Sequence, residues 1–349
     1  RFDKKKPSDI IGAGCSGSQS MAMKLKKING RNGVFFTFAA ISLAVIIMLS
    51  FNAYNDYRLK DNMEVIEIRV NTMNDFVKNL EEDIGNAIFI SGFRSLLSLE
   101  DYMMKYDNFI DNLGTSLNTA FSESFRLGTI TGTSGSDKMH LMGNNTFINW
   151  TTRMKEQANK TDISLDFTIN SVTISQSGQW MVDVTVNLNI NIKDNKNTAS
   201  WVINSKSYTK KINITGFVDP LYLVNNNGLI NNTIRKTTVP DFLGGNLATH
   251  LNNNYYIENT DAPSYLMRFE NDLGSSANGI ESLANVNQIS SAGLGPSGKT
   301  AVDHLYFSST ITTACRIEGM EVSHPWFYLD YLPNPPNHLA FYGRMCDVP

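Results

Sequence analysis

Residues 34–51 read VFFTFAAISLAVIIMLSF, an apolar run of eighteen residues without a charged side chain. At about 1.5 Å per residue, a helix of this length reaches about 27 Å, close to the thickness of the hydrocarbon core of a bilayer. The run is either a membrane helix or a secretion signal. A cleaved signal has a shorter apolar region and a small-x-small cleavage site, which residues 50–54 (SFNAY) match poorly. We therefore predict a retained transmembrane helix over Val34–Phe51.

Charges on the two sides of this run predict its orientation. The basic residues before it are Arg1, Lys4, Lys5, Lys6, Lys24, Lys26, Lys27 and Arg31. After it, Asp56 and Asp61 are mixed with Arg58 and Lys60. Because positive flanks stay in the cytoplasm, residues 1–33 are expected inside the cell and the rest outside it. The five N-glycosylation sequons all lie on the outer side, at Asn144, Asn149, Asn159, Asn213 and Asn231.

Composition and cysteines narrow the class of protein. The 349 residues include 30 basic and 33 acidic side chains, for a net charge of −3, so nothing indicates a nucleic-acid partner. Cys15 precedes the membrane run, whereas Cys315 and Cys346 form an even pair in the exported, oxidising part. We predict a disulfide between these two. The alternative is a pair of buried free thiols.

Beyond the membrane run, apolar residues recur at alternating spacings of four and three. This heptad stripe consists of Leu59, Met63, Ile66, Val70, Met73, Val77, Leu80, Ile84 and Ala87. It predicts that the membrane helix continues as a long amphipathic helix. Two uses of the stripe remain open: a parallel coiled coil with a second copy, or packing on the chain's own domain. Self-association would use Met63, Ile66, Val70, Met73, Val77, Leu80 and Ile84 and would make the chain a homo-oligomer.

A change of period marks the later part of the chain. Residues 96–125, broken near Gly114, and residues 147–159 read as helices. Apolar and polar residues then alternate over Ile163–Val172, Trp180–Ile192 and Ser200–Thr215, which predicts an antiparallel meander. The fold class is therefore α+β, in which a helix must cover the apolar face of the sheet.

We divide the chain into five parts. They are a leader (1–33), a transmembrane helix (34–51), a helical region (52–160), an antiparallel meander (161–224) and a mixed, disulfide-bounded C-terminal domain (225–349). In the last part, Asp241–Leu251 and Pro263–Leu273 are expected as helices. Ala301–Thr312 and Pro325–Tyr331 are expected as strands.

One full motif match concerns nucleotide binding. Residues 293–300 (GLGPSGKT) fit the phosphate-loop pattern G-x-x-x-x-G-K-[ST]. That chemistry needs a buried strand before the loop and a helix after it. Residues 285–292 are polar, and residues 301–307 read as a strand. We therefore expect no bound nucleotide.

Other reactive residues gather near the end of the chain. They are His304, His324 and His338, with Asp303 and Asp330. Their spacing fits no compact metal-ligand motif, and neither a G-x-S-x-G elbow nor an HExxH helix occurs. We expect no metal, no cofactor and no enzymatic activity.

The residues around the start of the apolar run carry a family resemblance. A basic leader ends in Gly30-Arg31-Asn32-Gly33, and the apolar helix begins at once with Val34-Phe35-Phe36. In this, and in the order of helix, sheet and cysteine-bounded segment, the chain resembles archaeal type IV pilin-like proteins. The resemblance implies cleavage between Gly33 and Val34 and a filament core of packed apolar helices. Phe38 departs from the family pattern, since many pilins carry glutamate there.

The C-terminal part resembles, in general texture, uncharacterised archaeal single-pass surface proteins. Together these observations predict a membrane-anchored extracellular structural or adhesive protein, functioning as a pilin-like filament subunit. Its expected partners are membrane lipid and further copies of the chain. The alternative is a single-pass ligand-binding or sensory ectodomain that works with a separate partner, because only a short basic tail lies inside. An ectoenzyme is a third class and would require a polar cluster in a cleft.

Overall fold

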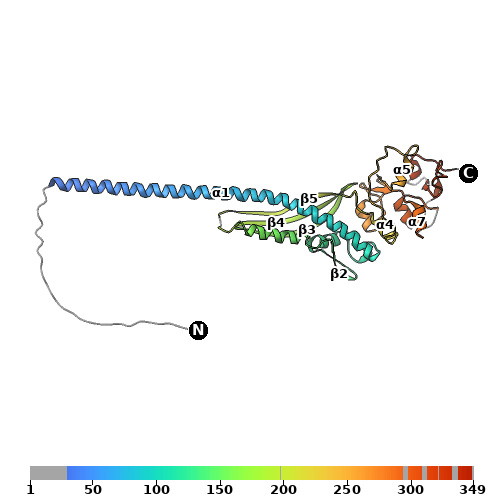
Figure 1. The fold of residues 1–349 in the computed structure, drawn as a ribbon, viewed down its shortest axis with the longest axis horizontal. Coiled ribbons are helices and arrows are strands. Elements are labelled where there is room, and N and C mark those ends of the chain that lie inside the picture. The colour runs from blue at the N-terminus through green and yellow to red at the C-terminus, as the bar shows by residue number, and fades with distance from the viewer. Residues whose placement is uncertain are drawn as a thin grey trace, which may run out of the picture. The chain divides into compact units, whose positions relative to one another are not determined.

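The computed structural model describes residues 30–196, 198–293, 298–308, 313–320, 322–331 and 337–347 (Figure 1). The side chains of residues 30–35 and 55–62 are not described. Contacts divide the chain into two units, one ending at Glu67 and one beginning at Ile68. Most of the predicted leader, up to residue 29, lies outside the described residues.

One helix, α1, runs from Gly30 to Tyr106. Neither glycine nor proline occurs between residues 34 and 84, so nothing in this stretch opposes a helix. In the first unit, the 19 residues Phe36–Tyr54 form an apolar stretch that is long enough to cross a membrane, and none of it is buried. This candidate membrane span overlaps the predicted Val34–Phe51.

The second unit contains a three-stranded antiparallel sheet in the order β3–β4–β5. These strands span Ile163–Gly178, Met181–Asp194 and Ser200–Asn213. Alternate residues of β4 point into the core, namely Val182, Val184, Val186, Leu188, Ile190 and Ile192. The predicted α+β class and antiparallel meander are confirmed. β3 extends beyond the predicted end at Val172.

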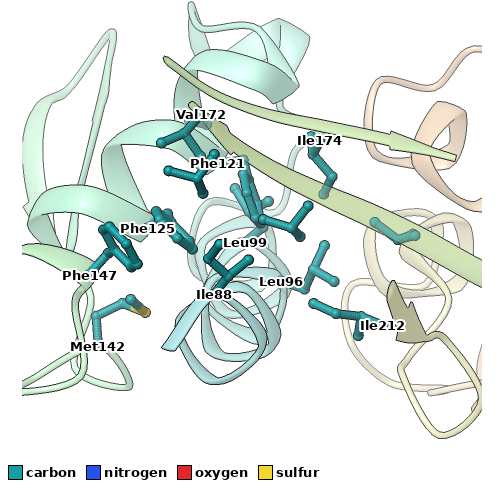
Figure 2. Packing of buried hydrophobic residues seen from close by; sticks show 14 of the residues in the cluster. Ile88, Leu96, Leu99, Phe121, Phe125, Met142, Phe147, Val172, Ile174 and Ile212 are labelled. Carbon is teal, nitrogen blue, oxygen red and sulfur yellow. The ribbon is translucent and has the colours of Figure 1, made fainter. Parts of the chain in front are cut away.

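The apolar face of this sheet packs against α1. A Cβ atom at Gly92 would lie 3.1 Å from the side chains of Val184 and Ile212, so the helix approaches closely here. Figure 2 shows Ile88, Leu96 and Leu99 of α1 among the buried apolar side chains of this core. Between residues 91 and 103, Phe93 is exposed and every other residue is buried or half-buried. The long amphipathic helix is thus not confirmed as predicted, because this part of α1 is buried around most of its circumference.

Smaller elements follow α1 on the way to the sheet. They are η1 (Asp111–Leu113), α2 (Leu117–Leu127), β1 (Thr129–Gly132), β2 (Gly135–Lys138) and α3 (Phe147–Asn159). Gly114, with φ +81°, ends the turn η1 close to the predicted break. The hydroxyl of Ser116 accepts a hydrogen bond from the Thr119 backbone and caps α2. Thr146 caps α3 in the same way.

The C-terminal part is made of short elements. They are α4 (Pro220–Asn225), α5 (Asn246–Asn252), β6 (Tyr256–Glu258), α6 (Tyr265–Phe269), β7 (Ile280–Ser282), α7 (Val286–Ser291), α8 (Asp303–Phe307), β8 (Ala314–Arg316), β9 (Tyr328–Asp330) and α9 (His338–Phe341). β6 pairs with β7 and β8 with β9, both antiparallel. The main apolar cluster includes residues from both sides of the boundary predicted at residue 225, among them Ile212 and Phe269.

Several C-terminal predictions need correction. The strand predicted over Ala301–Thr312 is wrong, because Asp303–Phe307 form helix α8, and residues 309–312 lie outside the described residues. Val302 and Tyr306 are both buried and four residues apart, which suits one helical turn. A short apolar run cannot by itself distinguish helix from strand. The other predicted segments are shorter in the structure, as α5, α6 and β9.

Cys315 and Cys346 form a disulfide, with their Cα atoms 5.6 Å apart. This confirms the predicted pairing, and the free-thiol alternative is wrong. Ile317 also forms a β-bridge with Cys346, so the cross-link joins segments that already lie side by side. By the chain-entropy estimate, a loop of this size contributes about 3–4 kcal/mol to stability.

Candidate membrane helix, surface sites and buried charge network

The residues proposed for self-association occupy two environments. In the first unit, Met63 and Ile66 are 70% and 45% exposed. In the second, Met73, Leu80 and Ile84 are at most 1% exposed and belong to the chain's own core, while Val70 and Val77 are half-buried. Met73, Leu80 and Ile84 thus pack internally, which is the second of the two uses left open for the stripe. Self-association through this helix stays a prediction.

The predicted modification sites lie at described positions. Gly33 and Val34, the residues of the implied cleavage site, fall within the first turns of α1. The exposed sequon asparagines are Asn144, Asn159, Asn213 and Asn231. Asn149 is half-buried in the first turn of α3, and its side-chain amide donates to the Gly143 carbonyl at 3.2 Å. Four of the five sequons therefore present an accessible acceptor.

A fully buried charge network lies in the C-terminal part. Arg268 of α6 donates through Nη1 to Asp219 Oδ2 at 2.6 Å and to Asp303 Oδ2 at 2.8 Å. All three side chains are 0% exposed. Asp219 also accepts a hydrogen bond from the Tyr256 hydroxyl at 2.8 Å, and Asp303 accepts one from the Ser282 hydroxyl at 2.9 Å. Each buried charge thus has several partners, as burial requires.

The two carboxylates of this group differ in their pKa values. Burial opposes the charge of Asp303, but Arg268 and His304 outweigh it and hold the pKa of Asp303 well below its ordinary value. Burial raises the pKa of Asp219, and the attraction of Arg268 does not fully offset burial and the nearby charge of Asp303. Asp303 is therefore the firmly ionised partner of Arg268.

A second group of buried charges surrounds His338. Its Nδ1 atom lies 2.9 Å from Asp330 Oδ2, and its Nε2 atom lies 3.1 Å from Glu281 Oε2. The Thr300 hydroxyl donates to Asp330 at 2.9 Å, and the Tyr342 hydroxyl donates to Glu281 at 2.7 Å. Burial alone would lower the pKa of His338, but the two carboxylates raise it to about 10. His338 is therefore a buried cation at neutral pH.

Strand β7 connects the two groups. The Ile280 carbonyl accepts from Arg268, the Glu281 side chain bonds His338, and Ser282 donates to Asp303. All three residues are fully buried. The network can hold neighbouring segments together through charge-assisted hydrogen bonds.

Sequence reasoning found only part of this arrangement. His304 lies against Asp303, and His338 against Asp330, whereas His324 lies apart and contacts Asn252. Arg268, Asp219 and Glu281 were missed, because they are far apart in sequence and follow no motif. In the described part of the chain, no group of three or more His, Cys, Asp or Glu side chains is arranged to hold a metal ion.

The residues of the phosphate-loop match have structural partners. Lys299 Nζ donates to the carbonyls of Tyr306 and Ser308, at 3.4 and 3.2 Å, near the end of α8. The Thr300 hydroxyl donates a hydrogen bond to Asp330. Helix α7, not a strand, precedes the motif, and residues 294–297 lie outside the described residues. The Lys and Thr are thus used within the fold.

An open cleft of about 370 Å³ lies beside Trp180 and β6. The indole N–H of Trp180 donates to Glu258 Oε1 at 2.6 Å, and Lys236 Nζ lies 3.0 Å from the same oxygen. Lys236 also lies 5.2 Å from the centroid of the Trp180 ring. The polar groups of this cleft are therefore bonded to one another.

Comparison with known proteins adds no residue assignment to these sites. No protein-family model matches the chain, and no curated protein or solved structure matches it.

Proposed function

We propose that this chain is a membrane-anchored extracellular surface protein that assembles as a pilin-like filament subunit. One observation carries the proposal: helix α1 contains both the apolar stretch Phe36–Tyr54, of which nothing is buried, and the residues that pack against the sheet. An apolar surface of this length is unfavourable in water. It needs lipid, or the same stretch of other copies, to cover it.

Three further features support export of the part after the membrane helix. The basic flank before residue 34 favours a cytoplasmic N-terminus. The disulfide between Cys315 and Cys346 is typical of an oxidising compartment. The exposed sequon asparagines, like this disulfide, come after the candidate membrane span in the sequence. The buried charge network then serves to stabilise a C-terminal part built from short elements.

The alternative function, a ligand-binding or sensory ectodomain, draws on the cleft beside Trp180. A ligand that binds Lys236 or Glu258 in place of the other would break the hydrogen bond between these two side chains. The two functions differ in the state of the native protein. A filament subunit is found in ordered fibres, whereas a receptor is dispersed in the membrane.

Protease added to intact cells tests the orientation. Cleavage beyond about residue 52, with the N-terminus spared, is expected because the basic flank stays inside. Protection of the C-terminal part in intact cells, but not in lysed cells, would reject the exported arrangement.

The mature N-terminus separates a filament subunit from a simple anchored protein. Mass spectrometry of the assembled protein should find Val34 first, because an uncleaved leader would hold its charges against the apolar core of a filament. Electron microscopy of the same sample should show fibres. An intact leader on the assembled protein would reject the pilin-like function and leave the anchored ectodomain.

A further inference from the structure

Glu100 is a carboxyl group of α1 that is buried against α6 and the segment after β5. Glu100 is 6% exposed. The Tyr265 hydroxyl donates to Glu100 Oε1 at 3.0 Å, and the backbone N–H of Val218 bonds the same carboxyl group. Glu100 therefore connects α1 to two segments that are far from it in sequence.

Among the residues that the structure describes, none supplies a cation paired with this carboxyl group. In the described part of the chain, no Lys, Arg or His nitrogen lies within 4.0 Å of it. Arg268, the cation on α6, is engaged by Asp219, Asp303 and the Ile280 carbonyl. The groups facing Glu100 are the Tyr265 hydroxyl from α6 and the Asp219 carboxyl from the segment after β5. On α1 itself, the neighbouring Asp101 pairs with His140 instead.

Helix α6 joins the region around Glu100 to the buried charge network. Tyr265 at its start contacts Glu100, while Arg268 near its end binds Asp219 and Asp303. The Phe269 carbonyl accepts from the Ile110 backbone at 3.0 Å. The Tyr265 ring also packs on Phe217, with centroids 6.1 Å apart. A change in the protonation of Glu100 therefore affects α6, the helix that holds the C-terminal part to α1.

We propose that Glu100 is a proton-controlled contact: protonated, it holds α6 and residues 214–219 against α1, and loss of its proton loosens them. The reason is electrostatic: an ionised Glu100 is a buried charge that faces Asp219 without a cation, whereas a protonated Glu100 carries no charge. The proposal does not depend on whether the chain forms filaments.

The direction of the pH effect follows from the pKa of Glu100. Burial raises this pKa from its ordinary value of 4.5 to about 8, the hydrogen bonds from Tyr265 and Val218 offset part of the rise, and Asp219 adds to it. The contact is then strongest below about pH 4.5. Between about pH 4.5 and 8, its opening constant rises about tenfold per pH unit, so the contact weakens. Above that pH, Glu100 causes no further change.

Other titrating groups act mainly in other ranges. His338, with a pKa raised to about 10, affects stability above about pH 6.5. Asp303 and Asp330, whose pKa values are lowered, act below about pH 4. Asp219, whose pKa is raised, acts in the same direction as Glu100. His250, whose burial lowers its pKa to about 4, acts between about pH 4 and 6.5 and in the opposite direction. Comparison with a Glu100 variant therefore separates the effect of Glu100 from those of Asp219 and His250.

Hydrogen exchange of the full chain in detergent tests the proposal. After correction for intrinsic exchange rates, Glu100 should raise the opening constant of residues 214–219 and 265–269 by about twentyfold from pH 5 to 6.5. Glu100→Gln should remove that part of the pH dependence, because the amide fills the site without titrating, and should leave only the dependence due to Asp219 and His250. The matched control is Glu81→Gln on the same helix, where the wild-type carboxylate is half-exposed and pairs with Lys206. That variant should keep the wild-type rise.

The same pH dependence in Glu100→Gln and in the wild type would overturn the proposal. Should Glu100→Gln fail to fold, infrared spectra of wild-type protein labelled with carbon-13 glutamate give the answer. A glutamic-acid carbonyl band that persists at pH 6.5 and titrates near pH 8 supports a protonated Glu100. Loss of every glutamic-acid band by pH 6.5 contradicts it.

Discussion

At the scale of single residues, His338 determines a pH range for the stability of the C-terminal part. Its folded pKa of about 10 lies above the ordinary histidine value, because Glu281 and Asp330 outweigh the effect of burial. A raised pKa means that the folded state binds the proton more tightly than the unfolded chain. The stability contributed by His338 is therefore fully present below about pH 6.5 and is lost as the pH rises through about 10.

His338→Gln should destabilise the protein by about 3–5 kcal/mol at pH 7, because Glu281 and Asp330 would remain buried without their cation. Urea unfolding of the full chain in detergent measures this loss. Between pH 8 and 10, where Glu100 has finished titrating, the variant should also lose less stability than the wild type. The control is His324→Gln, since His324 is partly exposed and lies apart from the network. Equal losses in the two variants would contradict the assignment of His338 as a buried cation.

At the scale of elements, the close contact between α1 and the sheet depends on Gly92, which has no side chain. Gly92 faces Val184 and Ile212 on the inner side of the sheet. Gly85, two turns earlier, faces the far end of the Lys210 side chain. The first site is bounded by packed core residues, whereas the second is bounded by a flexible side chain that can move aside.

Gly92→Val and Gly85→Ala should therefore have opposite effects. Gly92→Val is expected to cost about 1–3 kcal/mol, because its methyl groups would overpack the contact with Val184 and Ile212. Gly85→Ala is expected to stabilise by up to about 1 kcal/mol, through better helix propensity once Lys210 has moved. Thermal unfolding followed by circular dichroism compares the two. A neutral Gly92→Val would show that helix and sheet do not approach as closely as described.

At the scale of the whole molecule, apolar side chains fall into two populations. Those of the main cluster, from Met73 onward, are buried within the second unit. Those of Phe36–Tyr54 are exposed throughout. The second population has the length of a membrane span and lacks charge, so its free energy in water is lowered by transfer into lipid.

Ile41→Asp with Val45→Asp should prevent stable membrane insertion, since each aspartate near the centre of a span costs about 2.5–3.5 kcal/mol. The fraction of the chain that stays with membranes after an alkaline carbonate wash gives the result. Val65→Asp with Ile68→Asp is the matched control, because these side chains are also exposed but lie outside the candidate span. Full retention of the first variant would show that Phe36–Tyr54 does not cross the membrane.

The sequence by itself determined the features that depend on neighbouring residues. The candidate membrane helix follows from composition and length, and α3 follows from its local pattern and the Thr146 cap. Strand β4 follows from strict alternation, because one face of the sheet is buried and the other is more exposed. The Cys315–Cys346 pair was predictable, since only two cysteines follow the membrane run.

Tertiary structure decided the features that depend on which surfaces meet. The heptad stripe fits a second copy or the chain's own sheet equally well, and only packing shows that Met73, Leu80 and Ile84 are used internally. Helix α8 replaced a predicted strand, because its buried contacts outweighed an ambiguous local pattern. The network of Arg268 and His338 unites segments from residue 219 to residue 338. Burial makes isolated charges costly, so their pairing is set by three-dimensional proximity, which no local sequence pattern encodes.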